Sequence, residues 1–384
     1  MIHLLCKSIL YNGRFSIRTS PSQKWYLSHP QSSSLFSHRC FSSNANEPSF
    51  VVSYYMNKCG FSLESAISAS KFVHFDSPDN PDAVVSFLMS HGFSEKQISK
   101  LIKKSPHLLT FNPGKTILPK LEFFYSKGAS KLDVARICSG YTSILDRSLK
   151  NQIIPSFKYF RELLGSNEKV IMAVRRQPGI ISLPLEYATG NVDALRKIGV
   201  PISNIASSIA DRPSGLMRTT TRFNEMLQKV KEMGLNPLKC SFVFAVFVMG
   251  IMSETTWQRK IDAYCKWGFS KEEILMAFGK FPQFMTVSED KIAAVMNVFV
   301  NQLGLEPAVI ARNPIIVSLS LGKRIAPRAS VAQALVSKGF LKKDFSLSGF
   351  FVVTEQLFLK RYIIPYEVKD FPLLKLYKEK LNSP

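Results

Sequence analysis

The hydrophobic and polar positions of the chain repeat with a period of about 35 residues. Nine glycines mark this period, and an apolar residue stands six positions after each of them. Four positions before the glycine the residue is apolar in eight of the nine cases, the exception being Arg161. The glycines are Gly60, Gly92, Gly128, Gly165, Gly199, Gly234, Gly268, Gly304 and Gly339. Because two further columns agree with the glycines, they mark a repeated structural unit.

Each unit is predicted to hold two helices. The glycine ends one helix in the left-handed conformation, and a polar cap such as Ser94-x-x-Gln97 or Ser270-x-x-Glu273 starts the next one. A proline ten to fourteen residues after the glycine then ends this helix, because proline lacks the amide N–H and clashes with the preceding turn. A short apolar piece follows, and after it a second helix, for example over 118–126. The break prolines are Pro106, Pro178, Pro213, Pro282 and Pro314.

Helices with one apolar face cannot bury that face alone, so successive units must stack. The pattern therefore predicts an all-α fold, an α-solenoid superhelix. The expected organisation is a presequence over 1–41, an N-terminal capping region over 42–82, repeats over 83–350 and a C-terminal cap or tail over 351–384. The longest apolar run, 240–252, is too short for a membrane span and is predicted to be a buried helix, so the protein is not expected to span a membrane.

Composition narrows the function. The chain has 384 residues, and its 50 Lys and Arg against 28 Asp and Glu leave a net charge of +22, which favours a polyanionic partner. The six cysteines form no CxxC pair, the histidines have no metal-binding spacing, and no phosphate-binding glycine loop occurs. The sequence thus predicts no enzyme activity, no cofactor, no metal and no small-molecule substrate.

The first 46 residues contain five basic residues, eleven serines and no acidic residue, which is typical of an organellar transit peptide. Around Arg39 the segment Arg-Cys-Phe-Ser resembles a mitochondrial processing site, so the mature chain is expected to begin near Ser42. Removing 1–41 takes away five positive charges and leaves about +17. The mitochondrial matrix is the predicted location, with the plastid as second choice.

A cation recurs just before the break proline, and these side chains are candidates for phosphate contacts. Stacked units would place them at the same end of successive helices. The alternative is that Lys and Arg favour helix C-termini because of the macrodipole. The candidates are Lys103, Lys104, Arg175, Arg176, Arg212, Lys280 and Arg312.

The combined pattern resembles the mitochondrial transcription termination factor (mTERF) family, in its plant organellar form. The fullest matches are GFSEKQISKLIKKSPHLL at 92–109 and GFSKEEILMAFGKFPQFM at 268–285, with ILPKL at 117–121 as a second feature. The resemblance implies a basic groove that binds double-stranded DNA, organellar RNA or both. It also implies a role in mitochondrial transcription termination, transcription regulation or intron splicing. The chain is expected to be a monomer on nucleic acid.

Two alternatives remain at this point. A pentatricopeptide-like RNA-binding protein would share the repeat length and the organelle, but the recurrent proline would break the first helix of that motif. A helical-repeat scaffold for protein partners would share the solenoid but would not need the excess positive charge.

Overall fold

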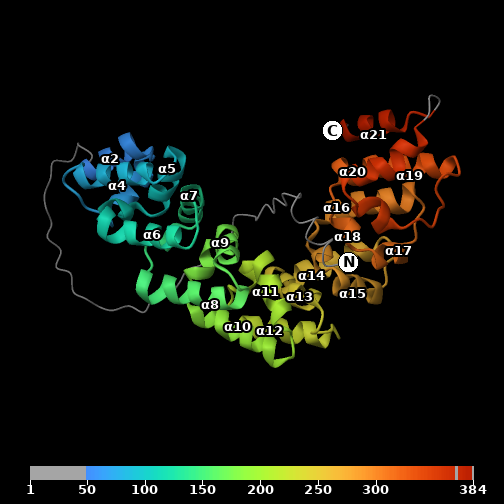
Figure 1. The fold of residues 1–384 in the computed structure, drawn as a ribbon, viewed down its shortest axis with the longest axis horizontal. Helices are drawn as coiled ribbons and strands as arrows, with labels where there is room; N and C mark the ends of the chain where they lie inside the picture. Colours follow the sequence, from blue (N-terminus) through green and yellow to red (C-terminus); the bar gives the residue numbers. More distant parts are fainter. Residues whose placement is uncertain (1–48, 368–370, 383–384) are drawn as a thin grey trace. The chain divides into compact units, whose positions relative to one another are not determined.

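A computed structural model describes residues 49–367 and 371–382, and within them the all-α repeat fold is confirmed (Figure 1). The predicted transit peptide and its processing site lie outside the described residues. Each unit, named here by its glycine, holds a first helix, a break and a second helix. In the part of the chain that is described, no single helix is both long and apolar enough to cross a membrane.

The repeat glycines have the predicted conformation. All nine have φ between 65° and 92°, and no other described residue has a positive φ. In this left-handed region a Cβ atom clashes with the backbone, which is why glycine occupies the position between helices.

The helices of the units agree with the predicted pattern. The first helices are α5 (Glu95–Lys104), α7 (Lys131–Gly140), α9 (Asn167–Arg176), α11 (Ile202–Asp211), α13 (Cys240–Ile251), α15 (Lys271–Lys280) and α17 (Pro307–Arg312). The second helices are α4 (Asp79–Ser90), α6 (Leu118–Ser126), α8 (Ile154–Leu164), α10 (Leu185–Lys197), α12 (Thr220–Glu232), α14 (Glu254–Cys265), α16 (Glu289–Met296) and α19 (Ala326–Ser337). The predicted capping boxes at Ser94 and Ser270 are both present.

In most units the break between the two helices is itself a short helix; in the Gly234 unit α13 leads directly into α14. The residue before the proline is not helical, with φ near −140° at Ser105 and −147° at Phe281, because the proline ring disfavours the α conformation there. The proline then starts a turn that buries the short apolar piece. The turns that follow a proline are η1 (Pro106–Thr110), η5 (Pro178–Ile181), η6 (Pro213–Leu216), η7 (Pro282–Thr286) and α18 (Ile315–Ser318), and η3 (Thr142–Ile144) is a break turn without a proline.

Several second helices begin with a wide π turn. The amide of Leu118 donates to the carbonyl of Pro113, five residues back, and Pro119 follows. The same bond precedes Pro155 in α8 and Pro327 in α19. Proline has no amide to continue the α ladder and its ring presses on the preceding turn, so that turn widens. The three π turns are η2 (Pro113–Ile117), η4 (Leu149–Ile153) and η9 (Leu321–Ile325).

The core lies between successive units. First helices contact their neighbours in sequence order from α5 through α17, and Figure 1 shows α9, α11 and α13 next to one another. The apolar column six residues after the glycine is fully buried at Ala66, Val134, Ile205 and Ile310. The apolar columns of the sequence are thus the contacts that join one unit to the next.

The two ends depart from the repeat. At the N-terminal end α2 (Phe50–Cys59) and α3 (Leu63–Ser70) pack on each other. At the C-terminal end the described residues of the Gly339 unit form no first helix before the π turn η10 (Ser348–Val352), which takes the place of the break. It is followed by α20 (Glu355–Phe358), η11 (Leu359–Ile363), η12 (Ile364–Tyr366) and α21 (Leu373–Asn382), and α21 packs on α19.

Candidate nucleic-acid interface

The first helices run in the same direction, so their C-termini form one edge of the stack, called here the break edge. Two contacts between helix ends show this. The guanidinium of Arg176, at the end of α9, donates to the carbonyl of Ala210 near the end of α11. The Lys280 Nζ, at the end of α15, lies 3.4 Å from the carbonyl oxygen of Arg312 at the end of α17. The sequence-predicted cations therefore share one edge.

These cations differ in the exposure of their side chains and in whether they form ion pairs. The side chains of Lys103, Lys104 and Arg312 are exposed and form no ion pair within the described residues. Arg175 is paired with Asp133 in the first turn of α7, with 3.0 Å between Nε and the carboxylate oxygen. Its side chain therefore extends toward the start of the preceding first helix and away from the break edge.

Arg212 differs from the other candidates. It is the capping residue at the end of α11, and its side chain is only partly accessible. Burial lowers the pKa of its guanidinium, with Asp211 acting in the opposite direction. Arg212 is therefore the least accessible of the seven candidates.

Both explanations offered for these cations have a structural basis. Lys280 and Arg176 contact the carbonyl groups at the end of the next first helix, where the macrodipole favours positive charge. Their positions on one exposed edge nevertheless suit a repeating phosphate backbone. The positions of the cations before the prolines thus agree with both the macrodipole and the phosphate explanation.

A second set of polar residues was missed in the sequence, because their roles are internal. In most units a side chain from the preceding second helix donates to the carbonyl groups of the break turn; we call this contact a carbonyl clamp. Asn191 Nδ2, for example, lies 3.1 Å from the carbonyl oxygen of Leu216 and 2.9 Å from that of Arg218. The donors are Asn80, Lys120, Gln152, Asn191, Tyr264, Lys291 and Arg328. Only the recurrence of polar residues within the second helices could have signalled them, and their positions vary from the start of the helix, as for Lys120, to its end, as for Tyr264.

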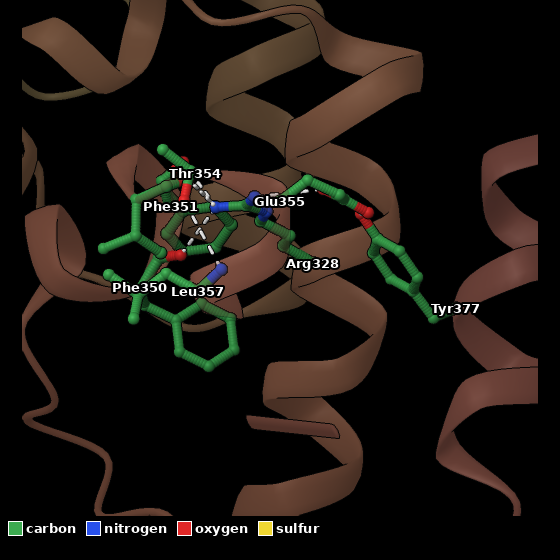
Figure 2. Close-up of polar contacts among 8 residues, drawn as sticks. Arg328, Phe350, Phe351, Thr354, Glu355, Leu357 and Tyr377 are labelled. Carbon is green, nitrogen blue, oxygen red and sulfur yellow. Dashed lines mark hydrogen bonds and ion pairs between the residues drawn. The ribbon is translucent and has the colours of Figure 1, made fainter. Parts of the chain in front are cut away.

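The clamp of Arg328 is the most extensive one (Figure 2). Its guanidinium is fully buried and lies 3.0, 3.1 and 2.9 Å from the carbonyl oxygens of Phe350, Phe351 and Val353. Glu355 pairs with it at 3.2 Å and also accepts a hydrogen bond from Tyr377 of α21. Burial, together with that bond, raises the pKa of the Tyr377 hydroxyl to about 12. Arg328 therefore joins the last repeat to the C-terminal cap.

Several Lys and Arg residues thus stabilise the fold and do not contribute to an interface. Besides Arg328, Lys120 is buried and donates to the carbonyl of Leu145, and burial lowers the pKa of its ammonium. Lys260 is 7% exposed and pairs with Glu289 at 2.9 Å. The net charge of the chain overstates the number of cations available to a partner.

In the described part of the chain, no group of three or more His, Cys, Asp and Glu side chains gathers as a metal site would require. A cleft of about 270 Å³ lies between α12 and α14 and is lined by methionines, Trp257 and the Lys229–Glu254 ion pair. Its lining residues include no nucleophile beside a general base.

Comparison with known proteins agrees with this architecture. A model of the mTERF family matches residues 84–359. Two relatives from Arabidopsis thaliana are similar along most of the chain. Transcription termination factor MTERF15, mitochondrial, is 22% identical over 295 residues, which is 75% of this chain and 56% of the relative. Transcription termination factor MTERF8, chloroplastic, is 23% identical over 316 residues, which is 72% of this chain and 61% of the relative.

The chain therefore spans somewhat more than half the length of these two relatives. The family match favours the mTERF interpretation of the repeat over the pentatricopeptide one. With left-handed glycines between helices, prolines at the breaks and a family match over most of the folded residues, the chain belongs to the mTERF family.

Proposed function

We propose that this protein binds organellar nucleic acid along the break edge and acts in mitochondrial gene expression. The observation that carries the proposal is the row of exposed cations at the parallel C-termini of successive first helices. Regularly spaced cations suit a regularly charged sugar–phosphate backbone, and such contacts fix position without reading base identity. The partner is double-stranded DNA, RNA or both, and the protein acts as a binding factor without catalysing a reaction.

The names of the relatives support an organellar role. Both are named transcription termination factors, one mitochondrial and the other chloroplastic. The acid-free N-terminal segment with its Arg39 processing pattern favours the mitochondrial matrix over the plastid. Within the organelle, the protein would terminate or regulate transcription, or support intron splicing.

A salt titration tests whether the break edge binds nucleic acid. Four accessible cations of the column are changed together to Gln: Lys104, Arg176, Lys280 and Arg312. Each phosphate contact contributes about 0.9 to the slope of log affinity against log salt on B-DNA, and about 0.7 on single strands. With four contacts, the variant should therefore show a slope flatter by about 3.6 on duplex DNA and by about 2.8 on single strands. Circular dichroism should remain unchanged, since Gln has a helix propensity close to that of Lys.

The matched control changes four exposed lysines outside the break edge, namely Lys58, Lys231, Lys378 and Lys380. If this control flattens the slope as much as the column variant does, the break edge is not the interface. Sequencing of nucleic acid crosslinked to the protein in isolated mitochondria, with DNase and RNase controls, identifies the partner. Recovery of no crosslinked nucleic acid would contradict the proposed function and favour a protein scaffold.

A further inference from the structure

The helices of the repeat differ in the charge at their starts. Most of them carry an acidic residue in the first turn, for example Glu95 in α5, Asp133 in α7 and Glu168 in α9 among the first helices and Glu254 in α14 among the second helices. An acid there offsets the partial positive charge of the helix N-terminus. The second helices that begin with η2, η4 and η9 have no acidic residue in the first turn and carry Lys115, Lys150 and Lys323 instead.

No acidic side chain of the described residues balances the positive charge of these three lysines. Their side chains are exposed, and none forms an ion pair or a side-chain hydrogen bond within 49–367 and 371–382. A cation in the first turn faces the like charge of the helix end, so the macrodipole disfavours it. The explanation that accounts for cations before the break prolines therefore does not apply to Lys115, Lys150 and Lys323.

All three lysines lie on the break edge, because a carbonyl clamp follows each of them within about a turn. Lys120, in the helix that Lys115 begins, donates to the carbonyl of Leu145 in the next break. Gln152 follows Lys150 and donates to the carbonyl of Leu183. Arg328 follows Lys323 and donates to Phe350 and Phe351. Each clamp holds the start of the second helix against the break of the following unit.

The break edge thus carries two rows of cations, one from the ends of first helices and one from the starts of second helices. Side-chain caps order the second row. Asn112 accepts a hydrogen bond from the amide of Lys115 at 2.9 Å, and Ser320 accepts one from the amide of Lys323 at 3.3 Å. The backbone beneath each lysine is therefore held in place while its ammonium group remains free.

We propose that Lys115, Lys150 and Lys323 bind backbone phosphates of the nucleic acid and form the second row of the interface. The proposal rests on the proposed function and adds residues to it. A phosphate supplies the negative charge that these helix starts lack, so binding should relieve the repulsion between each lysine and its helix end.

The test changes Lys115, Lys150 and Lys323 together to Gln in the full chain. Its binding is measured by fluorescence anisotropy between 50 and 300 mM KCl, with a 30-base-pair DNA duplex and a single-stranded RNA of 30 nucleotides as probes. The slope of log affinity against log salt should become flatter by about 2 to 3, from three contacts at 0.7 to 0.9 each. The melting temperature should stay the same or rise slightly, since a repulsive charge has been removed.

The matched control is the Gln variant of Lys96, Lys169 and Lys271. These lysines are also exposed and lie in first turns, but at the opposite ends of first helices and beside acidic residues. Their replacement should leave the slope unchanged. The proposal is overturned, while the proposed function stands, if the slope of log affinity against log salt flattens equally in the test and control variants. An unchanged slope in the test variant would overturn it as well. If the wild-type chain binds neither probe, the proposed function fails first.

Discussion

The units that begin at Gly268 and Gly234 have neighbouring places in the chain but different construction. In the Gly268 unit, α15 ends at Lys280, Pro282 starts the turn η7, and the Tyr264 hydroxyl donates to the carbonyl of Phe284 at 2.8 Å. In the Gly234 unit no proline occurs at the break, and α13 leads within two residues into α14 at an angle of 114°. No side chain of α12 clamps the end of α13 among the described residues.

The two units also differ in chemistry. Helix α13 is buried nearly all round, with Phe242, Val246 and Val248 among its buried residues, and it ends at the exposed apolar Ile251 without a cation. Helix α15 has one apolar stripe and ends at exposed Lys280. Proline, clamp and terminal cation thus occur together at Gly268 and are absent together at Gly234. In these two units the terminal cation therefore accompanies the break proline and not the repeat glycine.

The largest expected effect comes from removing a clamp. Arg328→Met should lower the free energy of unfolding by about 3–5 kcal/mol, because three carbonyl groups and the partner Glu355 lose a buried donor. Urea denaturation measures the change. Arg222→Met is the counterpart beside the Gly234 unit, where the arginine is exposed and forms a surface ion pair with Glu225. It should cost less than about 0.5 kcal/mol. Similar costs at the two positions would show that clamps do not stabilise the breaks.

A smaller effect is expected at the glycine that opens the Gly268 unit. Gly268 has φ of 85°, and an added Cβ would lie 3.4 Å from the Cγ of Pro307. Gly268→Val should therefore cost about 1–3 kcal/mol, measured by thermal melting. Gly322 lies in a helical turn with nothing within 4 Å of an added Cβ. Gly322→Ala should be neutral or slightly stabilising. A melting temperature lowered equally by both changes would contradict the repeat alignment.

The smallest effect distinguishes two ion pairs of nearly equal length. Lys260–Glu289, at 2.9 Å, involves a lysine that is 7% exposed, whereas Lys229–Glu254, at 2.8 Å, is 52% and 73% exposed. Glu289→Gln should cost about 1 kcal/mol, since it leaves a buried ammonium without its partner and solvent screens part of the loss. Glu254→Gln should cost about 0–0.5 kcal/mol. Equal costs would show that burial of Lys260 adds nothing.

The Glu289 pair also predicts a pH dependence. The hydrogen bond from Lys260 lowers the pKa of the Glu289 carboxyl below its usual 4.5, against the effect of burial. A carboxyl with a lowered folded pKa contributes stability that is fully present above pH 4.5 and is lost as the pH falls through the folded value. The stability difference between wild type and Glu289→Gln should therefore be constant above about pH 5 and shrink below pH 4.5. A difference that does not change down to pH 3 would contradict this linkage.

Local rules explain how much of the fold could be predicted from the sequence. The glycines were identifiable because only glycine adopts positive φ without strain, and all nine do so. The breaks were identifiable because proline cannot continue a helix. The second helix over 118–126 and the buried helix from Cys240 follow from apolar spacing and are present as predicted. The Gly128 unit has a break turn without proline, η3, since packing against its neighbours can impose the turn that local sequence leaves open.

Among the charged residues, the sequence predicted the positions of the cations but not which of them are free. By itself the sequence determined the repeat, the helix ends and the column of cations, because these depend on backbone sterics and on spacing along one chain. Only the tertiary structure decided which cations are free, because that depends on contacts between units. Arg328 and Lys120 became buried clamps, Arg212 became partly buried, and Lys115, Lys150 and Lys323 remained exposed on the break edge. A cationic side chain becomes buried when the next unit places carbonyl groups beside it, and otherwise it stays exposed. The order of residues within one unit does not specify that contact.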